Sequence, residues 1–203
     1  MRSEKIKRMI MKINSNMNKI KSYLKELTIV TIGVLIALVI SNFKENNQAR
    51  DYYNSSIETV KNEVEVNYSI LKNIIEDQTR LLDTINKHSA DDITISDLIV
   101  EKGGGLQAAT LNNLGLEFYK NNQINSVDFE MMSRLIRMQS VSKIIDTKME
   151  KLMDFMYPNL FDDSEKSKKL VILYLNNALN SEIQLMHLYE DFIDEYIENE
   201  HND

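Results

Sequence analysis

Three histidines, His88, His187 and His201, are the first residues to test for chemistry, because imidazole serves as a metal ligand and as a general base. Carboxylate-bridged di-iron sites in helical bundles take a Glu-x-x-His motif from each of two helices. Glu198 and His201 have that spacing once, near the end of the chain, whereas His187 has Gln184 three positions before it. One copy cannot supply both halves of such a site, so we expect no metal centre.

The sequence also lacks a cysteine and a phosphate-binding glycine loop. The chain has no cysteine, which excludes disulfides, thiolate metal sites and a cysteine nucleophile. The consecutive glycines at 103–105 are followed by Leu106 and Gln107, whereas a phosphate-binding loop needs a Lys and a Ser or Thr directly after its glycines. We interpret the glycines as a linker. We predict a non-enzymatic protein that has no catalytic residues, no cofactor and no bound metal.

The stretch from Leu27 to Phe43 contains 17 residues and no charge. As a helix it is roughly 26 Å long, at the short end of what a bilayer core of about 30 Å requires. A core helix of a soluble protein would show a polar stripe, which this stretch lacks. A signal peptide cleaved after Ser41 remains an alternative, although its basic region would be unusually long. We favour a retained single membrane span. Its marker residues are Leu27, Gly33, Ala37, Ile40 and Phe43.

Charge is distributed unevenly on the two sides of this span. Residues 1–26 carry eight basic and two acidic side chains, whereas residues 44–203 carry 16 basic and 29 acidic ones. Basic flanks are retained on the cytoplasmic side of a membrane. We therefore expect a bacterial inner-membrane protein with a cytoplasmic basic amphipathic segment at 1–26, a transmembrane helix at 27–43 and a periplasmic helical bundle at 44–203. The acidic body excludes nucleic acid as a partner, because nucleic-acid binding needs a basic surface.

The sequence GVLIALVISNFKE, residues 33–45, resembles the signature of a bacterial family, the domain-of-unknown-function family 6090. Members of that family carry a stretch close to G-I-L-I-A-L-x-I-x-N-W-N-E near the N-terminus. A weaker similarity lies in TLNNLGLEFYKNNQI, residues 110–124. The present chain has Phe43 where the family tends to have Trp. The resemblance implies a single-pass membrane protein with a helical extracytoplasmic part, and it implies no activity.

Residues 45–88 are predicted to form one long stalk helix, because apolar residues recur in alternating steps of three and four. The first part of this stripe is a candidate interaction seam. It comprises Ile57, Val60, Val64, Asn67, Leu71 and Ile74. We place Asn67 and Gln78 at a solvated edge of the stripe. The alternative is that they fix the register with amides of a partner helix.

Residues 89–105 break the helical pattern, because turn formers and a short alternating piece precede the three glycines. A short helix is predicted over 106–121, with four of its apolar side chains facing inward. These are Leu111, Leu114, Phe118 and Tyr119. Gly115 is expected at a close crossing or a turn.

Two further helices are predicted beyond this region, the first from a cap at Ser126 to about Tyr157 and the second ending near Glu198. Asp162 and Glu165 have the spacing of a capping pair for the second helix. Ile136 and Leu173 are among the apolar residues assigned to their inner faces. The expected fold is all-α, with one N-terminal transmembrane helix, a long stalk helix and an antiparallel helical bundle.

The leading functional hypothesis is a membrane-anchored helical protein that acts in the cell envelope as an interaction or scaffold component. Its partners would be the lipid bilayer and either a second copy in a homodimer or another envelope protein. Gly33 and Ala37, four residues apart, would allow close helix contact within the membrane. The alternative hypothesis is a ligand-sensing extracytoplasmic bundle that signals through a partner protein.

Overall fold

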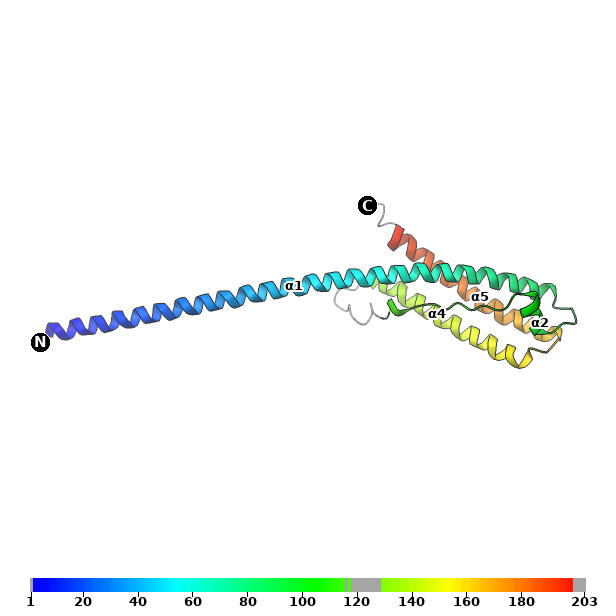
Figure 1. Cartoon of the computed structure of the whole chain (residues 1–203), viewed down its shortest axis with the longest axis horizontal. Helices are drawn as coiled ribbons and strands as arrows, with labels where there is room; N and C mark the ends of the chain where they lie inside the picture. The colour runs from blue at the N-terminus through cyan, green and yellow to red at the C-terminus, as the bar shows by residue number, and fades with distance from the viewer. Residues whose placement is uncertain (1, 116, 118–128, 199–203) are drawn as a thin grey trace. The chain divides into compact units, whose positions relative to one another are not determined.

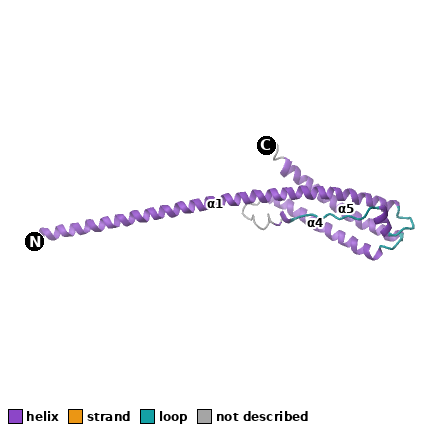
Figure 2. Cartoon of the chain, viewed as in Figure 1, coloured by secondary structure: helices purple, strands orange, loops and turns teal. Residues whose placement is uncertain are grey.

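A computed structural model of the chain describes residues 2–115, 117 and 129–198, and the described part is helical without strands (Figure 2). Its helices are α1 (Arg2–Lys87), α2 (Ile95–Asp97), the π-helix η1 (Leu98–Lys102), α4 (Phe129–Met156), the 3₁₀-helix η2 (Tyr157–Asn159), α5 (Glu165–Ile193) and the π-helix η3 (Asp194–Glu198). The predicted all-α class is confirmed, and the predicted stalk over 45–88 is helical to Lys87. The chain forms two compact units, residues 1–52 and 53–203, which are described in turn.

The first unit is the N-terminal part of α1 and contains the apolar stretch. Large apolar side chains from Leu24 to Phe43 are exposed all around the helix. The hydroxyl groups of Thr28 and Thr31 donate to the carbonyl oxygens of Leu24 and Leu27, both at 2.8 Å. These bonds satisfy the hydroxyls within the helix itself. Among the described residues, one helix has the length and composition to cross a membrane, and it contains this stretch.

The second unit is a bundle of the C-terminal part of α1 with α4 and α5, and α5 returns alongside α4 (Figure 1). Its core is made of aliphatic and aromatic side chains that all three helices contribute. Core residues include Val64, Leu71 and Leu81 from α1, Leu135, Ile145 and Leu152 from α4, and Leu175, Leu185 and Phe192 from α5. Ile136 and Leu173, which we expected on inner faces, are instead exposed, because each lies just outside the buried stripe of its helix.

Two segments depart from the predicted elements. Residues 95–102, predicted to break the helical pattern, form α2 and η1, and the segment between the glycines and Gly115 differs from the helix predicted there. Residues 104–113, referred to as the strap, have no regular secondary structure, and only Leu114 and Gly115 begin a helical turn. The predicted helix over 106–121 is therefore wrong over 106–113. Leu111 is half-buried, but Leu114 is exposed. Phe118, Tyr119 and the predicted cap Ser126 lie outside the described residues.

The N-terminus of α5 also differs from the predicted capping pair. Ser164 is the N-cap, and its hydroxyl oxygen accepts from the backbone N–H of Ser167. Asp162 lies two residues before Ser164. Its carboxylate accepts from the backbone N–H of Ser164 at 2.8 Å and from the Ser167 hydroxyl at 2.6 Å. These hydrogen bonds lower the pKa of Asp162. The prediction of a helix start here was right, but the capping role belongs to a serine next to Glu165.

Candidate functional site

The predicted span residues share one environment within the first unit. Leu27, Gly33, Ala37, Ile40 and Phe43 are all exposed, and a methyl group added at Gly33 would meet no atom within 4 Å. Exposure of so many adjacent large apolar side chains is unfavourable in water, at about 25 cal/mol per Å² of apolar surface. The stretch therefore needs an apolar environment that the described chain does not supply.

The predicted seam residues face the core of their own chain. Val60, Val64, Asn67, Leu71 and Ile74 are buried, and Ile57 is half-buried against the same core. The stripe is covered by α4, α5 and the strap, so in this structure it is not an open surface for a second chain. Its alternating pattern reflects intramolecular packing, because a helix in a bundle buries the same kind of stripe as a coiled coil.

Asn67 is buried and holds the strap through both ends of its side-chain amide. Its Nδ2 donates to the carbonyl oxygen of Asn112 at 2.6 Å, and its Oδ1 accepts from the backbone N–H of Asn112 at 3.0 Å. The side chain thus imitates the partner strand that an extended backbone lacks. Our placement of Asn67 at a solvated edge is wrong, since its hydrogen bonds within the chain satisfy it inside the core.

Gln78 is a second buried anchor, three helical turns further along α1. Its Nε2 donates to the carbonyl oxygen of Gln107 and to the Glu182 carboxylate, each at 3.0 Å. Gln78 is 1% exposed and Glu182 is 0% exposed. The solvated-edge placement is therefore wrong for Gln78 too, and it is paired within its own chain.

Glycines at both ends of the strap permit backbone conformations or close approaches that a side chain would prevent. Gly104 and Gly105 have φ of 76° and 98°, values that side chains with a Cβ rarely adopt. A Cβ at Gly103 would lie 2.2 Å from a methyl carbon of Leu81. At the other end, the buried Gly115 donates its N–H to Glu63 at 2.8 Å. This geometry agrees with the interpretation of the glycines at 103–105 as a linker. It also agrees with the close approach expected at Gly115.

Two tyrosines of the bundle have shifted pKa values near these anchors. Burial raises the pKa of Tyr189 above its usual range, while a hydrogen bond with Asn67 opposes the rise. Tyr68 donates to the Glu190 carboxylate at 3.0 Å, and this bond raises the pKa of Tyr68. The pKa of Glu190 is lowered, chiefly by its contact with His187 at 2.9 Å. His187 therefore lies in a surface hydrogen bond with Glu190.

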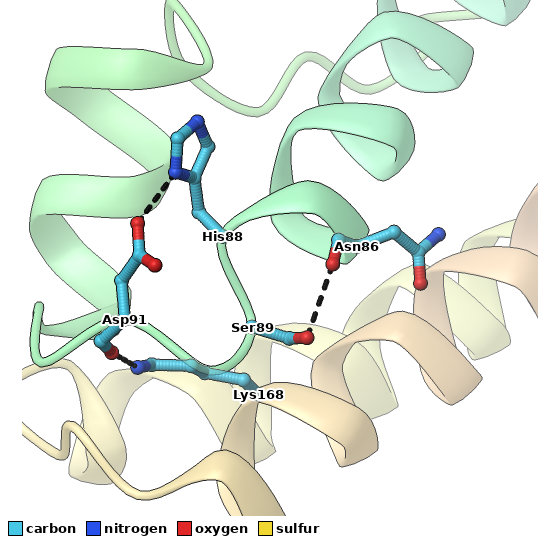
Figure 3. A network of polar contacts seen from close by, with 5 residues as sticks. All are labelled: Asn86, His88, Ser89, Asp91 and Lys168. Carbon is cyan, nitrogen blue, oxygen red and sulfur yellow. Dashed lines mark hydrogen bonds and ion pairs between the residues drawn. The ribbon is translucent and has the colours of Figure 1, made fainter.

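The end of the bundle at α2, referred to as the tip, comprises residues 88–102 and 157–164. Its loops are tied by backbone bonds, from Ile95 N to Asp162 O at 3.1 Å and from Ser96 N to Leu160 O at 2.8 Å. The buried Lys168 donates to the carbonyl oxygen of Asp91 (Figure 3).

The same view shows the side chain of Asp91 turned toward His88, with 2.6 Å between Oδ2 and Nδ1. This hydrogen bond lowers the pKa of Asp91. Beside it, the Ser89 hydroxyl donates to the carbonyl oxygen of Asn86 at 3.0 Å, so the turn after α1 is fixed at several points (Figure 3).

On this hydrogen-bonded base the tip exposes large apolar side chains. Phe161 is 86% exposed, Tyr157 69% and Val100 64%. Over the described ranges, no group of three or more His, Cys, Asp or Glu side chains is placed to hold a metal ion. His201 lies outside those ranges. The arrangement offers exposed apolar surface and anchored loops.

Comparison with known proteins leaves this geometry as the main guide to function. No protein-family model, curated protein or solved structure matches the chain. The resemblance to family 6090 therefore rests on its two short sequence patches alone. Sequence reasoning missed Glu182 and Lys168 as buried groups. A signal was present, since both occur at helical spacing with Val171, Leu175 and Tyr189, which are buried on the same stripe.

Proposed function

We propose that this protein is a membrane-anchored, non-enzymatic helical protein that acts as an interaction or scaffold component of the bacterial envelope. In this proposal residues 27–43 cross the inner membrane once, the basic N-terminal segment lies in the cytoplasm and the bundle lies in the periplasm. The observation that carries the proposal is the exposed, charge-free stretch from Leu27 to Phe43 next to a unit with its own core. The charge difference across the stretch supports the orientation.

The tip supports an interaction role for the bundle. Phe161 and Tyr157 are exposed on a turn that is tied to α2 by two backbone hydrogen bonds. A rigid loop loses little conformational entropy on binding, and buried aromatic residues contribute strongly to protein interfaces. We therefore propose the tip as the surface that contacts another envelope protein or a second copy of the chain.

The location is tested with a C-terminally tagged protein and protease added outside intact spheroplasts. A retained span predicts a full-length band in the membrane fraction and digestion of the tag from outside. The Ile36→Lys variant, which places a charge in the middle of the stretch, should weaken membrane retention. A soluble exported band that is shorter by about 41 residues, the length expected for cleavage after Ser41, would contradict the anchor.

The interaction role is tested by cross-linking in intact cells. The wild type should give a discrete product of higher mass, and Phe161→Ser should reduce it at least several-fold because the exposed ring is lost from the tip. Leu173→Ser is the matched control, since Leu173 is an exposed apolar residue of the same unit outside the tip. Equal loss in both variants, or no product with the wild type, would count against the tip.

A further inference from the structure

Glu182 is a carboxyl group buried in the bundle core without a cation. It lies on α5, is 0% exposed, and receives one hydrogen bond, from Gln78 Nε2 to its Oε1 at 3.0 Å. Its second oxygen, Oε2, has no hydrogen-bond partner. A buried carboxylate with a single neutral donor is poorly stabilised, because burial removes the water that would solvate its charge.

The side-chain amide of Gln78 also has a buried oxygen without a hydrogen-bond partner. Both hydrogen-bond contacts of its Nε2 are directed at acceptors, the Gln107 carbonyl oxygen and Glu182 Oε1. Turning the amide over would set its oxygen against these two acceptors, so the orientation is fixed by its neighbours. The Gln78 oxygen Oε1 is then left buried and without a donor. The contact thus contains two unsatisfied oxygens, one on each side chain.

A single proton resolves both deficits. Protonation of Glu182 converts Oε2 from an acceptor into an O–H donor, and the Gln78 oxygen is the acceptor in the same contact that lacks a donor. A carboxylic acid and a primary amide can then pair through N–H···O and O–H···O bonds. We propose that Glu182 is a proton-binding site of the folded protein, and that its proton, shared with Gln78, keeps the strap anchored to α1.

Gln78 connects Glu182 to the strap. The same Nε2 group that donates to Glu182 holds the Gln107 carbonyl. Loss of the proton places a negative charge beside an amide oxygen that also carries partial negative charge. The side chains must then separate or admit water, and either change disturbs the bond to Gln107. The proton therefore acts on the strap through one side chain.

The charged groups around Glu182 do not replace the proton. On α4, the ammonium group of Lys148 donates to the Ser181 hydroxyl at 2.7 Å and to the Asn177 carbonyl at 2.8 Å. On α1, Asp77 pairs with Arg80. The strap has no titratable residue over 104–113. Burial raises the pKa of Glu182 to about 7 against the opposing effect of the Gln78 hydrogen bond, and no charged neighbour contributes.

The direction of the pH dependence follows from this raised pKa. The stabilising contribution is complete below the unfolded-state value of 4.5 and is lost as the pH rises toward about 7, where the folded protein also deprotonates. Over this range the folding equilibrium constant should fall by on the order of 100-fold through this one group. The inference concerns the bundle and does not depend on the proposed membrane function.

The test compares full-length wild type with Glu182→Gln in detergent micelles. The glutamine keeps the shape, stays neutral and supplies both an N–H donor and an oxygen acceptor to Gln78. Urea unfolding should show wild-type stability falling between about pH 5 and about pH 8, and a flatter curve for the variant. Amide hydrogen exchange of residues 104–113 should be at least tenfold faster in the wild type than in the variant at about pH 8.

Glu190→Gln is the matched control, because Glu190 is a carboxylate of the same helix with a lowered pKa. It should leave the Glu182-dependent loss of stability in place. Infrared spectra at about pH 6 should show a protonated carboxyl band in the wild type that is absent from Glu182→Gln. Parallel stability curves for wild type and Glu182→Gln, or the absence of that band, would overturn the proposal.

Discussion

At the scale of single residues, the bundle is organised by buried polar side chains that replace missing backbone partners. An extended segment on a helical surface has no neighbouring strand to receive its hydrogen bonds. Glu63, Asn67 and Gln78 supply those bonds from one side of α1 to Gly115, Asn112 and Gln107. The polar residues on the stalk therefore determine where the strap lies.

Asn67→Ala should destabilise the second unit by about 1–3 kcal/mol, because it removes two hydrogen bonds and leaves the N–H and carbonyl of Asn112 unpaired. Urea unfolding followed by circular dichroism measures this loss. Asn62→Ala is the control on the same helix, because Asn62 is exposed, and it should change stability by less than about 0.5 kcal/mol. Similar values for both variants would show that Asn67 does not anchor the strap.

Gly103→Ala should destabilise the bundle by about 1–3 kcal/mol, because the new methyl group would overlap Leu81 and approach the carbonyl oxygens of Ile99 and Leu98. Thermal unfolding measures the effect. Combining it with Leu81→Ala should give a loss smaller than the sum of the two single losses, since the smaller side chain leaves room. Strict additivity would mean that the overlap with Leu81 is not the cause.

At the scale of elements, the conformation of the strap follows from the distance between its anchors on α1. From Gln78 to Glu63 the anchors on α1 span roughly 22 Å at 1.5 Å per residue. The eight steps from Gln107 to Gly115 cover roughly 26 Å when extended, but only about 12 Å as a helix. The extended form alone meets all three anchors. This explains why the predicted helix over 106–113 does not form, although its composition allows one.

Ser164→Ala should destabilise α5 by about 1 kcal/mol, because it removes the N-cap acceptor of the Ser167 N–H. The loss should appear as a lower unfolding midpoint and as faster amide exchange in the first turn of α5. Ser140→Ala is the control, since its exposed hydroxyl only bonds back to its own helix. If the two variants behaved alike, the cap would contribute nothing specific.

At the scale of the whole molecule, the chain divides into a unit without a core and a unit with one. Residues 53–203 contain the whole described core, whereas the large apolar side chains described between Tyr23 and Tyr52 are exposed. We expect a fragment of residues 53–203 to be soluble, helical and cooperatively folded, as measured by circular dichroism during thermal unfolding. Aggregation of this fragment, or a gradual transition, would mean that residues 1–52 are needed for its fold.

The local pattern of residue types was sufficient to predict the long helices and the apolar stretch. Few helix breakers, a charge-free run from Leu27 to Phe43 and apolar steps of three and four along 45–88 are properties of neighbouring residues, so they determined the helices and the candidate span. The spacing of Asp162 and Glu165 likewise predicted a helix start, although the N-cap is Ser164.

The candidate site depended on tertiary structure. We placed Asn67 and Gln78 at a solvated edge because their hydrogen-bond partners, in the strap and on α5, lie about 30 to 100 positions away in the sequence. Glu182 lies at helical spacing with Val171, Leu175 and Tyr189, but its hydrogen-bond partner Gln78 is 104 positions away and is brought to it only by the packing. Burial and long-range hydrogen bonding arise only when α1, α4, α5 and the strap are packed together, and that packing makes Glu182 a buried group that binds a proton in our proposal.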